Sequence, residues 1–137
     1  MAPATSTEIE QIMVNGNVET LVTVANRVGK LLKDQRLTTN QIRNVFGTVR
    51  QIQMRWSTNP AKAYRDAVLL RPKLAYFAER EKRAKGGGSE GMETLQSVLE
   101  PALKFLAVDG QPEQQRFERF AEFFEAIVAY HKYYGGR

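Results

Sequence analysis

Few residues in this chain of 137 could perform acid–base, nucleophilic or metal chemistry. There is no cysteine, which excludes thiolate nucleophiles, disulfides and cysteine-ligated zinc. The single histidine, His131, would have to act alone in a catalytic relay, and no carboxylate or nucleophile stands at a recognisable spacing from it. A packed, hydrogen-bonded histidine is the favoured interpretation. We therefore expect no enzyme activity, no metal and no cofactor.

Two further patterns resemble functional sites but favour simpler interpretations. Glu118, Glu122 and Glu125 follow one another at helical spacing, which is typical of a solvated helix face. Residues 86–91, with the sequence GGGSEG, lack the Gly-Lys-Ser/Thr ending of a phosphate-binding loop. We interpret them as a flexible connector.

Positive charge is concentrated in the middle of the chain. The net charge is +5, and residues 37–91 hold eleven Lys and Arg against four Asp and Glu. No acidic residue occurs at positions 35–65, where the cations are Arg36, Arg43, Arg50, Arg55, Lys62 and Arg65. This distribution favours an anionic partner such as the phosphates of a nucleic acid.

Arg43 and Arg50 are seven residues apart, so a helix would place them on one face at a separation of about 10 Å. They form either a stripe that tracks phosphates or the solvated side of an amphipathic helix. The missing acids favour the phosphate stripe, because solvated faces usually mix both signs.

The other candidate cations have competing interpretations. Lys30 and Lys33 lie near the end of an expected helix, where cations also stabilise the helix dipole. Farther along the chain, Tyr76 lies among three cations and offers a stacking surface for a base, although an aromatic at this spacing is more often part of a core. Those cations are Arg71, Lys73 and Arg80.

Hydrophobic periodicity predicts helices throughout the chain. Asn17 is a candidate cap for a helix over residues 17–34, and Thr38 with Gln41 has the spacing of a capping box for a helix over 38–56. Further helices are expected over about 59–85, 92–106 and 112–134, with a short one over 6–14. Within the fourth, Pro72 predicts a kink or break near residues 70–71.

These elements indicate an all-α fold, a single bundle of about five helices with a short extra N-terminal helix. We divide the chain into an N-terminal extension over residues 1–16 and a helical bundle domain over 17–137, with the connector at 86–91. The sequence has no signal peptide and no apolar run of membrane-spanning length. A cytoplasmic protein without membrane contact is therefore expected.

Three strings of the sequence together resemble the small subunit of the Csm effector complex of type III-A CRISPR systems. They are LTTNQIR at 37–43, LRPKLAYFAER at 70–80 and FEAIVAYHKYYGG at 124–136. The resemblance implies an all-helical subunit without nuclease activity, which lines the channel that holds guide RNA and target RNA. Adding the basic positions of these strings gives the candidate RNA-binding residues Lys30, Lys33, Arg43, Arg50, Arg55, Arg71, Lys73, Arg80 and Lys132.

The resemblance also implies the partners. These are guide RNA, target RNA, the other Csm-complex subunits, and further copies of this chain, associated end to end or as a dimer. An alternative from a different class is a protein–protein scaffold, whose basic face binds acidic surfaces of neighbouring subunits and does not contact RNA directly.

Overall fold

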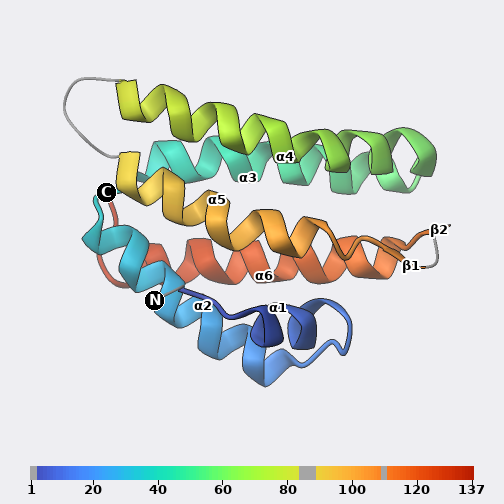
Figure 1. Cartoon of the computed structure of the whole chain (residues 1–137), viewed down its shortest axis with the longest axis horizontal. Helices are drawn as coiled ribbons and strands as arrows, with labels where there is room; N and C mark the ends of the chain where they lie inside the picture. The colour runs from blue at the N-terminus through green and yellow to red at the C-terminus, as the bar shows by residue number, and fades with distance from the viewer. Residues whose placement is uncertain (1–2, 84–88, 109–110) are drawn as a thin grey trace.

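The computed structural model describes residues 3–83, 89–108 and 111–137. Within these ranges the chain forms an all-α bundle, as expected, and Figure 1 shows α3 and α4 at one edge, α5 and α6 across the middle, and α1 with α2 at the other edge. The helices are α1 (Ser6–Met13), α2 (Val18–Asp34), α3 (Thr39–Trp56), α4 (Pro60–Arg83), α5 (Ser89–Leu103) and α6 (Gln114–Tyr133).

Local capping explains where several helices begin. The Asn17 side chain accepts a hydrogen bond from the Thr20 amide at 3.1 Å, which caps α2 as predicted. The expected capping box of α3 is present, because the Thr38 hydroxyl accepts from the Gln41 amide and the Gln41 side chain accepts from the Thr38 amide. The predicted end of α3 at Trp56 is also confirmed.

A kink or a break was expected at Pro72, and helix α4 has no break there. It runs without interruption from Pro60 to Arg83. Pro72 is exposed, whereas Leu70 and Leu74 are fully buried. A proline inside a helix costs about 3 kcal/mol, and the burial of two leucine side chains offsets a penalty of that size.

The predicted boundaries of the last two helices were wrong by a few residues. Helix α5 already includes residues 89–91, so the second half of the expected connector is helical, and residues 86–88 lie outside the described residues. Pro112 belongs to a two-residue strand rather than to the first turn of α6. This strand, β2 (Gln111–Pro112), pairs antiparallel with β1 (Ala107–Val108), and only then does α6 begin.

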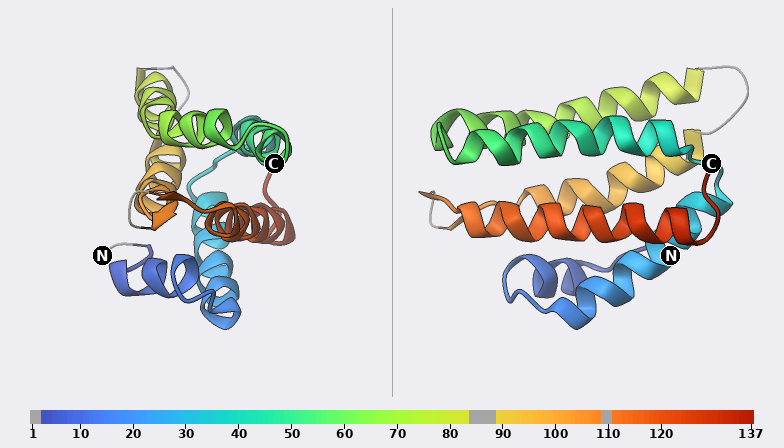
Figure 2. Two further views of the ribbon diagram at one scale, coloured as in Figure 1. Left: turned by 90° about the vertical axis from the view of Figure 1, so that its right-hand side faces the viewer. Right: turned by 180° about the vertical axis from the view of Figure 1, so that it is seen from behind.

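Helix α6 is the centre of the hydrophobic core. It packs against α2 on one side and α3 on the other, and the right view of Figure 2 shows it lying between them. Its four phenylalanines are completely buried, namely Phe117, Phe120, Phe123 and Phe124. Because α6 contacts neighbours on two sides, its buried surface is wider than the single face that the sequence predicted.

The expected N-terminal helix is present as α1 and contributes to the same core. Ile9, Ile12 and Met13 are buried, and α1 packs against α2, α5 and α6. The Glu8 carboxylate in its first turn accepts two hydrogen bonds from Arg27 of α2, at 3.0 and 2.7 Å. Residues 3–16 are thus packed onto the bundle.

Candidate nucleic-acid interface

Helices α3 and α4 form an antiparallel hairpin (Figure 1). Most of the candidate residues belong to these two helices. Two side-chain contacts define the register of the hairpin. Near the turn, Arg55 Nη1 donates to Asp66 Oδ2 at 2.5 Å; near the open end, Gln41 Nε2 donates to Glu81 Oε2 at 2.9 Å.

Arg43 and Arg50 are both exposed on α3, as predicted. The Arg50 guanidinium lies 5.6 Å from the ring centroid of Phe46 and donates to Gln53 at 3.3 Å. Neither arginine is ion-paired to a carboxylate in the part of the chain that the structure describes. No acidic residue occurs in α3 itself, so both charges remain available to an anion.

The outer face of α4 carries a continuous stripe that sequence analysis identified only in part. Its members recur every three or four residues and are all exposed: Lys62, Arg65, Leu69, Lys73, Tyr76 and Arg80. We call these six residues the α4 stripe. Lys62 and Arg65 were not among the predicted binding residues, although their helical spacing to Lys73 and Arg80 was a signal available in the sequence.

Acidic groups of the hairpin are held by specific partners. Asp66 is paired with Arg55, and Glu81 accepts from Gln41 and lies 3.8 Å from Arg80. Arg55 is thereby occupied by Asp66 on the same surface, so its charge is largely offset. Lys62, Arg65 and Lys73 are not ion-paired to any described carboxylate.

Arg71 does not lie with Lys73, although both were expected at one site. Since α4 is continuous, successive residues point about 100° apart, and Arg71 faces α5. Its Nη2 lies 3.9 Å from Glu100 Oε1, and its buried Nε has no hydrogen-bond partner among the described residues. Arg71 is therefore separated from the outer face of the hairpin.

Lys30 and Lys33 lie on α2, away from the hairpin, and both contact Asp34. The nitrogen–oxygen distances are 3.1 and 3.6 Å. The hydrogen bond from Lys30 holds the pKa of Asp34 below its ordinary value. Lys132 is exposed in the last turn of α6. All three lysines stand in or near the last turn of a helix, where they also stabilise the helix dipole.

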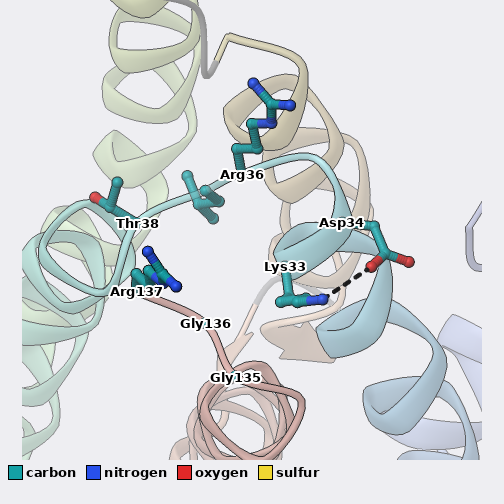
Figure 3. A pocket seen from close by; sticks show the side chains of 8 residues that line it. Lys33, Asp34, Arg36, Thr38, Gly135, Gly136 and Arg137 are labelled. Carbon is teal, nitrogen blue, oxygen red and sulfur yellow. Dashed lines mark ion pairs between the residues drawn. The ribbon is translucent and has the colours of Figure 1, made fainter.

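A second basic region surrounds a pocket at the end of the bundle where α2, α3 and α6 meet. Figure 3 shows Lys33 facing Asp34, with Arg36 extending away from both Lys33 and Arg137. The pocket has a volume of about 480 Å³. Arg36 has a φ of +66°, a left-handed conformation that favours glycine. Sequence analysis did not select Arg36 or Arg137 as binding residues.

His131 has a structural environment. It is buried in α6, and its Nε2 lies 2.6 Å from the carbonyl oxygen of Leu37. Because a carbonyl oxygen only accepts hydrogen bonds, Nε2 carries the proton. The packed, hydrogen-bonded histidine predicted from the sequence is therefore present.

The glutamate row of α6 does not gather into a metal site. Glu118 accepts a hydrogen bond from Gln53 of α3 at 2.6 Å, while Glu122 and Glu125 are exposed beside a shallow groove between α2 and α6. Within residues 3–83, 89–108 and 111–137, no three His, Cys, Asp or Glu side chains lie close enough together to hold a metal ion.

The comparison with protein families identifies the chain. The family model described as Csm2 Type III-A matches residues 15–137, which is nearly the whole sequence. The chain belongs to the Csm2 family of type III-A CRISPR systems. It is a small subunit of the Csm complex, in agreement with the resemblance found in the sequence. None of the curated proteins compared with the chain matches it.

Two of the three strings that resemble Csm2 meet at one end of this bundle. His131, in the third string, bonds to Leu37 in the first, and the Thr39 hydroxyl of the first donates to the carbonyl oxygen of Gly136 in the third, at 3.3 Å. In this Csm2 chain, hydrogen bonds between these two strings therefore connect the end of α6 to the start of α3. Of the helices the structure describes, none is long and apolar enough to cross a membrane.

Proposed function

We propose that this Csm2 chain is a non-catalytic, RNA-binding small subunit that holds the sugar-phosphate backbones of guide RNA and target RNA. The observation that carries the proposal is the set of exposed cations on the two helices of the α3–α4 hairpin. Five of them have no ion-pair partner among the described residues: Arg43, Arg50, Lys62, Arg65 and Lys73.

Charge availability supports a phosphate-binding role. A cation already paired with a carboxylate must break that pair to bind a phosphate, and none of these five has such a pair with a carboxylate in the described ranges. Each phosphate contact releases counterions from the nucleic acid, which gives affinity without sequence preference. Sequence specificity then comes from base pairing between guide and target, as in RNA-guided systems generally.

The proposal includes a place within the complex. The subunit stacks beside the backbone subunits in the cytoplasm, contacts further copies of itself end to end or as a dimer, and leaves bond cleavage to its neighbours. His131 supports the non-catalytic assignment, since its Nε2 proton is engaged with the Leu37 carbonyl inside the core.

Salt dependence of RNA binding tests the proposal. If the five free cations each contact a phosphate, the logarithm of affinity for single-stranded RNA falls against the logarithm of salt concentration with a slope of about −3.5. The double variant Arg43→Gln and Arg50→Gln removes two contacts, so its slope should be shallower by about 1.4.

Lys104→Gln is the matched control for this experiment. Lys104 is exposed after α5 and outside the hairpin, so its loss should leave the slope nearly unchanged. An equal effect of the control and the double variant would contradict a binding site on the hairpin.

Cross-linking of the assembled complex distinguishes the scaffold alternative. RNA binding predicts links from Arg43 and Arg50 to nucleotides. A protein–protein scaffold predicts links from the same residues to neighbouring subunits and none to RNA.

A further inference from the structure

Tyr76 is the one aromatic residue among the six residues of the α4 stripe. Its side chain is 62% exposed, although tyrosine at such a spacing is usually part of a core. The buried side of α4 is formed instead by Ala63, Ala67, Leu70, Leu74 and Ala78. The ring therefore contributes little to the packing of the bundle and remains open to a ligand.

The groups around Tyr76 are two cations, an aromatic ring and the exposed Glu79 three residues after it, and Arg80 also lies 3.8 Å from Glu81. Lys73 stands three residues before it and Arg80 four residues after it, both exposed on the same stripe. The Arg80 guanidinium lies 5.9 Å from the ring centroid of Tyr76 and 5.2 Å from that of Phe77. Arg80 thus makes a cation–π contact with one face of the Tyr76 ring.

We propose that the Tyr76 ring stacks against an unpaired base of an RNA strand, while Lys73 and Arg80 contact the phosphates on either side of that base. This proposal rests on the proposed RNA-binding function and adds a base contact to it. An exposed ring between two cations is the arrangement that binds single-stranded nucleic acid without sequence preference, because every base has a flat face.

Charge favours RNA over a protein surface as the occupant. The α4 stripe holds four cations and no acid, with two exposed apolar side chains, Leu69 and Tyr76, between them. Only a strongly anionic partner that also presents flat apolar surfaces matches both features at once. Single-stranded RNA does so, because phosphates and unstacked bases alternate along it.

Tyr133 provides a matched comparison within the same chain. It is 76% exposed and lies at the end of α6, one residue after Lys132 and outside the α4 stripe. Its ring also packs edge-on against Tyr134, with 5.0 Å between centroids. Tyr133 is therefore an exposed aromatic residue that lies outside the α4 stripe.

The test uses the full chain and two single-stranded RNA oligomers of equal length, one with bases and one with abasic riboses. We expect the natural chain to bind the base-bearing strand about ten-fold more tightly. Tyr76→Leu should remove most of this preference and leave the salt slope unchanged, because no phosphate contact is lost. Tyr76→Phe keeps the ring and should keep the preference, and Tyr133→Leu should have no effect.

A fluorescent base gives an independent measurement of stacking. With 2-aminopurine in the strand, the natural chain and Tyr76→Phe should quench the fluorescence on binding, and Tyr76→Leu should not. A Tyr76→Leu variant that folds normally and still prefers the base-bearing strand would overturn the base contact. The base contact would also be overturned if Tyr76→Leu weakened binding to both strands equally. The same holds if the sole defect of Tyr76→Leu were a loss of association with other subunits.

Failure of the proposed function gives a different result. In that case the natural chain itself binds neither oligomer in a salt-dependent way, and both the proposed function and the base contact are wrong. Salt-dependent binding by the natural chain together with no effect of Tyr76→Leu overturns the base contact alone.

Discussion

His131 of α6 donates a hydrogen bond through Nε2 to the carbonyl oxygen of Leu37, 2.6 Å away and 94 residues earlier in the chain. Both residues are about 1% exposed. The bond satisfies a carbonyl group in the connection between α2 and α3, which otherwise would be buried without a partner. The only histidine of the chain therefore fixes the end of the bundle where α2, α3 and α6 meet.

Replacing His131 should destabilise the fold. His131→Leu leaves the Leu37 carbonyl unsatisfied, and we expect the free energy of unfolding to fall by about 1 to 3 kcal/mol. Chemical denaturation followed by circular dichroism measures this change. The neighbouring exposed residue gives the control, since Lys132→Leu should stay within about 0.5 kcal/mol of the natural chain. Equal stability of the two variants would contradict a structural role for the bond.

Arg36 should gain stability when replaced by glycine. At a φ of +66° a side chain costs about 1 kcal/mol relative to glycine, and the residue occupies the position after α2 where glycine is common. We expect Arg36→Gly to raise the free energy of unfolding by about 0.5 to 1 kcal/mol. Arg36→Ala keeps the Cβ atom and should give no gain. Equal stabilisation by both variants would show that charge repulsion, and not backbone strain, is relieved.

Two helical glycines should respond in opposite ways to alanine. A Cβ atom at Gly29 of α2 would lie 2.6 Å from the Cβ of Tyr130 and 2.8 Å from the backbone nitrogen of His131. Gly29→Ala must push α6 away and should destabilise by about 1 to 3 kcal/mol. Gly47 of α3 has no atom within 4 Å of its added Cβ, so Gly47→Ala should stabilise by about 0.5 to 1 kcal/mol. Thermal unfolding of both variants measures the contrast, and a similar sign for the two would contradict the close approach of α2 and α6.

The ion pair between Glu8 and Arg27 should make stability depend on acid pH. The hydrogen bonds from Arg27 lower the pKa of Glu8 from 4.5 to about 2. A carboxylate with a lowered pKa stabilises the fold above its unfolded pKa, and this contribution is lost as pH falls from about 4.5 toward 2. Because Arg27 is partly exposed, solvent screening limits the contribution to about 1 kcal/mol.

Glu8→Gln tests this pH dependence. Urea unfolding at pH 7 should show a loss of up to about 1 kcal/mol relative to the natural chain, and the difference should shrink as the pH approaches 2. Glu10→Gln, an exposed position on the same helix, is the control. A difference that stays constant from pH 7 to pH 2 would assign the effect of Glu8 to something other than its charge.

Helix starts were predictable because their signals are local. The capping residues of α2 and α3 act within three residues of their own positions, so Asn17 and Thr38 identify the helix starts without knowledge of the fold. At Pro72, where a kink or a break was expected, the break is absent for the opposite reason. Whether a proline interrupts a helix depends on the packing of the flanking Leu70 and Leu74, and that packing is a tertiary property.

Sequence alone determined that this is an all-α protein with its cations concentrated in the middle of the chain, since composition and periodicity are readable without coordinates. Tertiary structure decided which of those cations meet a carboxylate. Arg55 meets Asp66 and Arg71 faces Glu100 because helices bring distant residues together, and an ion pair depends on distance in space. The same packing left Tyr76 exposed between Lys73 and Arg80, because the opposite side of α4 supplies enough apolar side chains to fill the core.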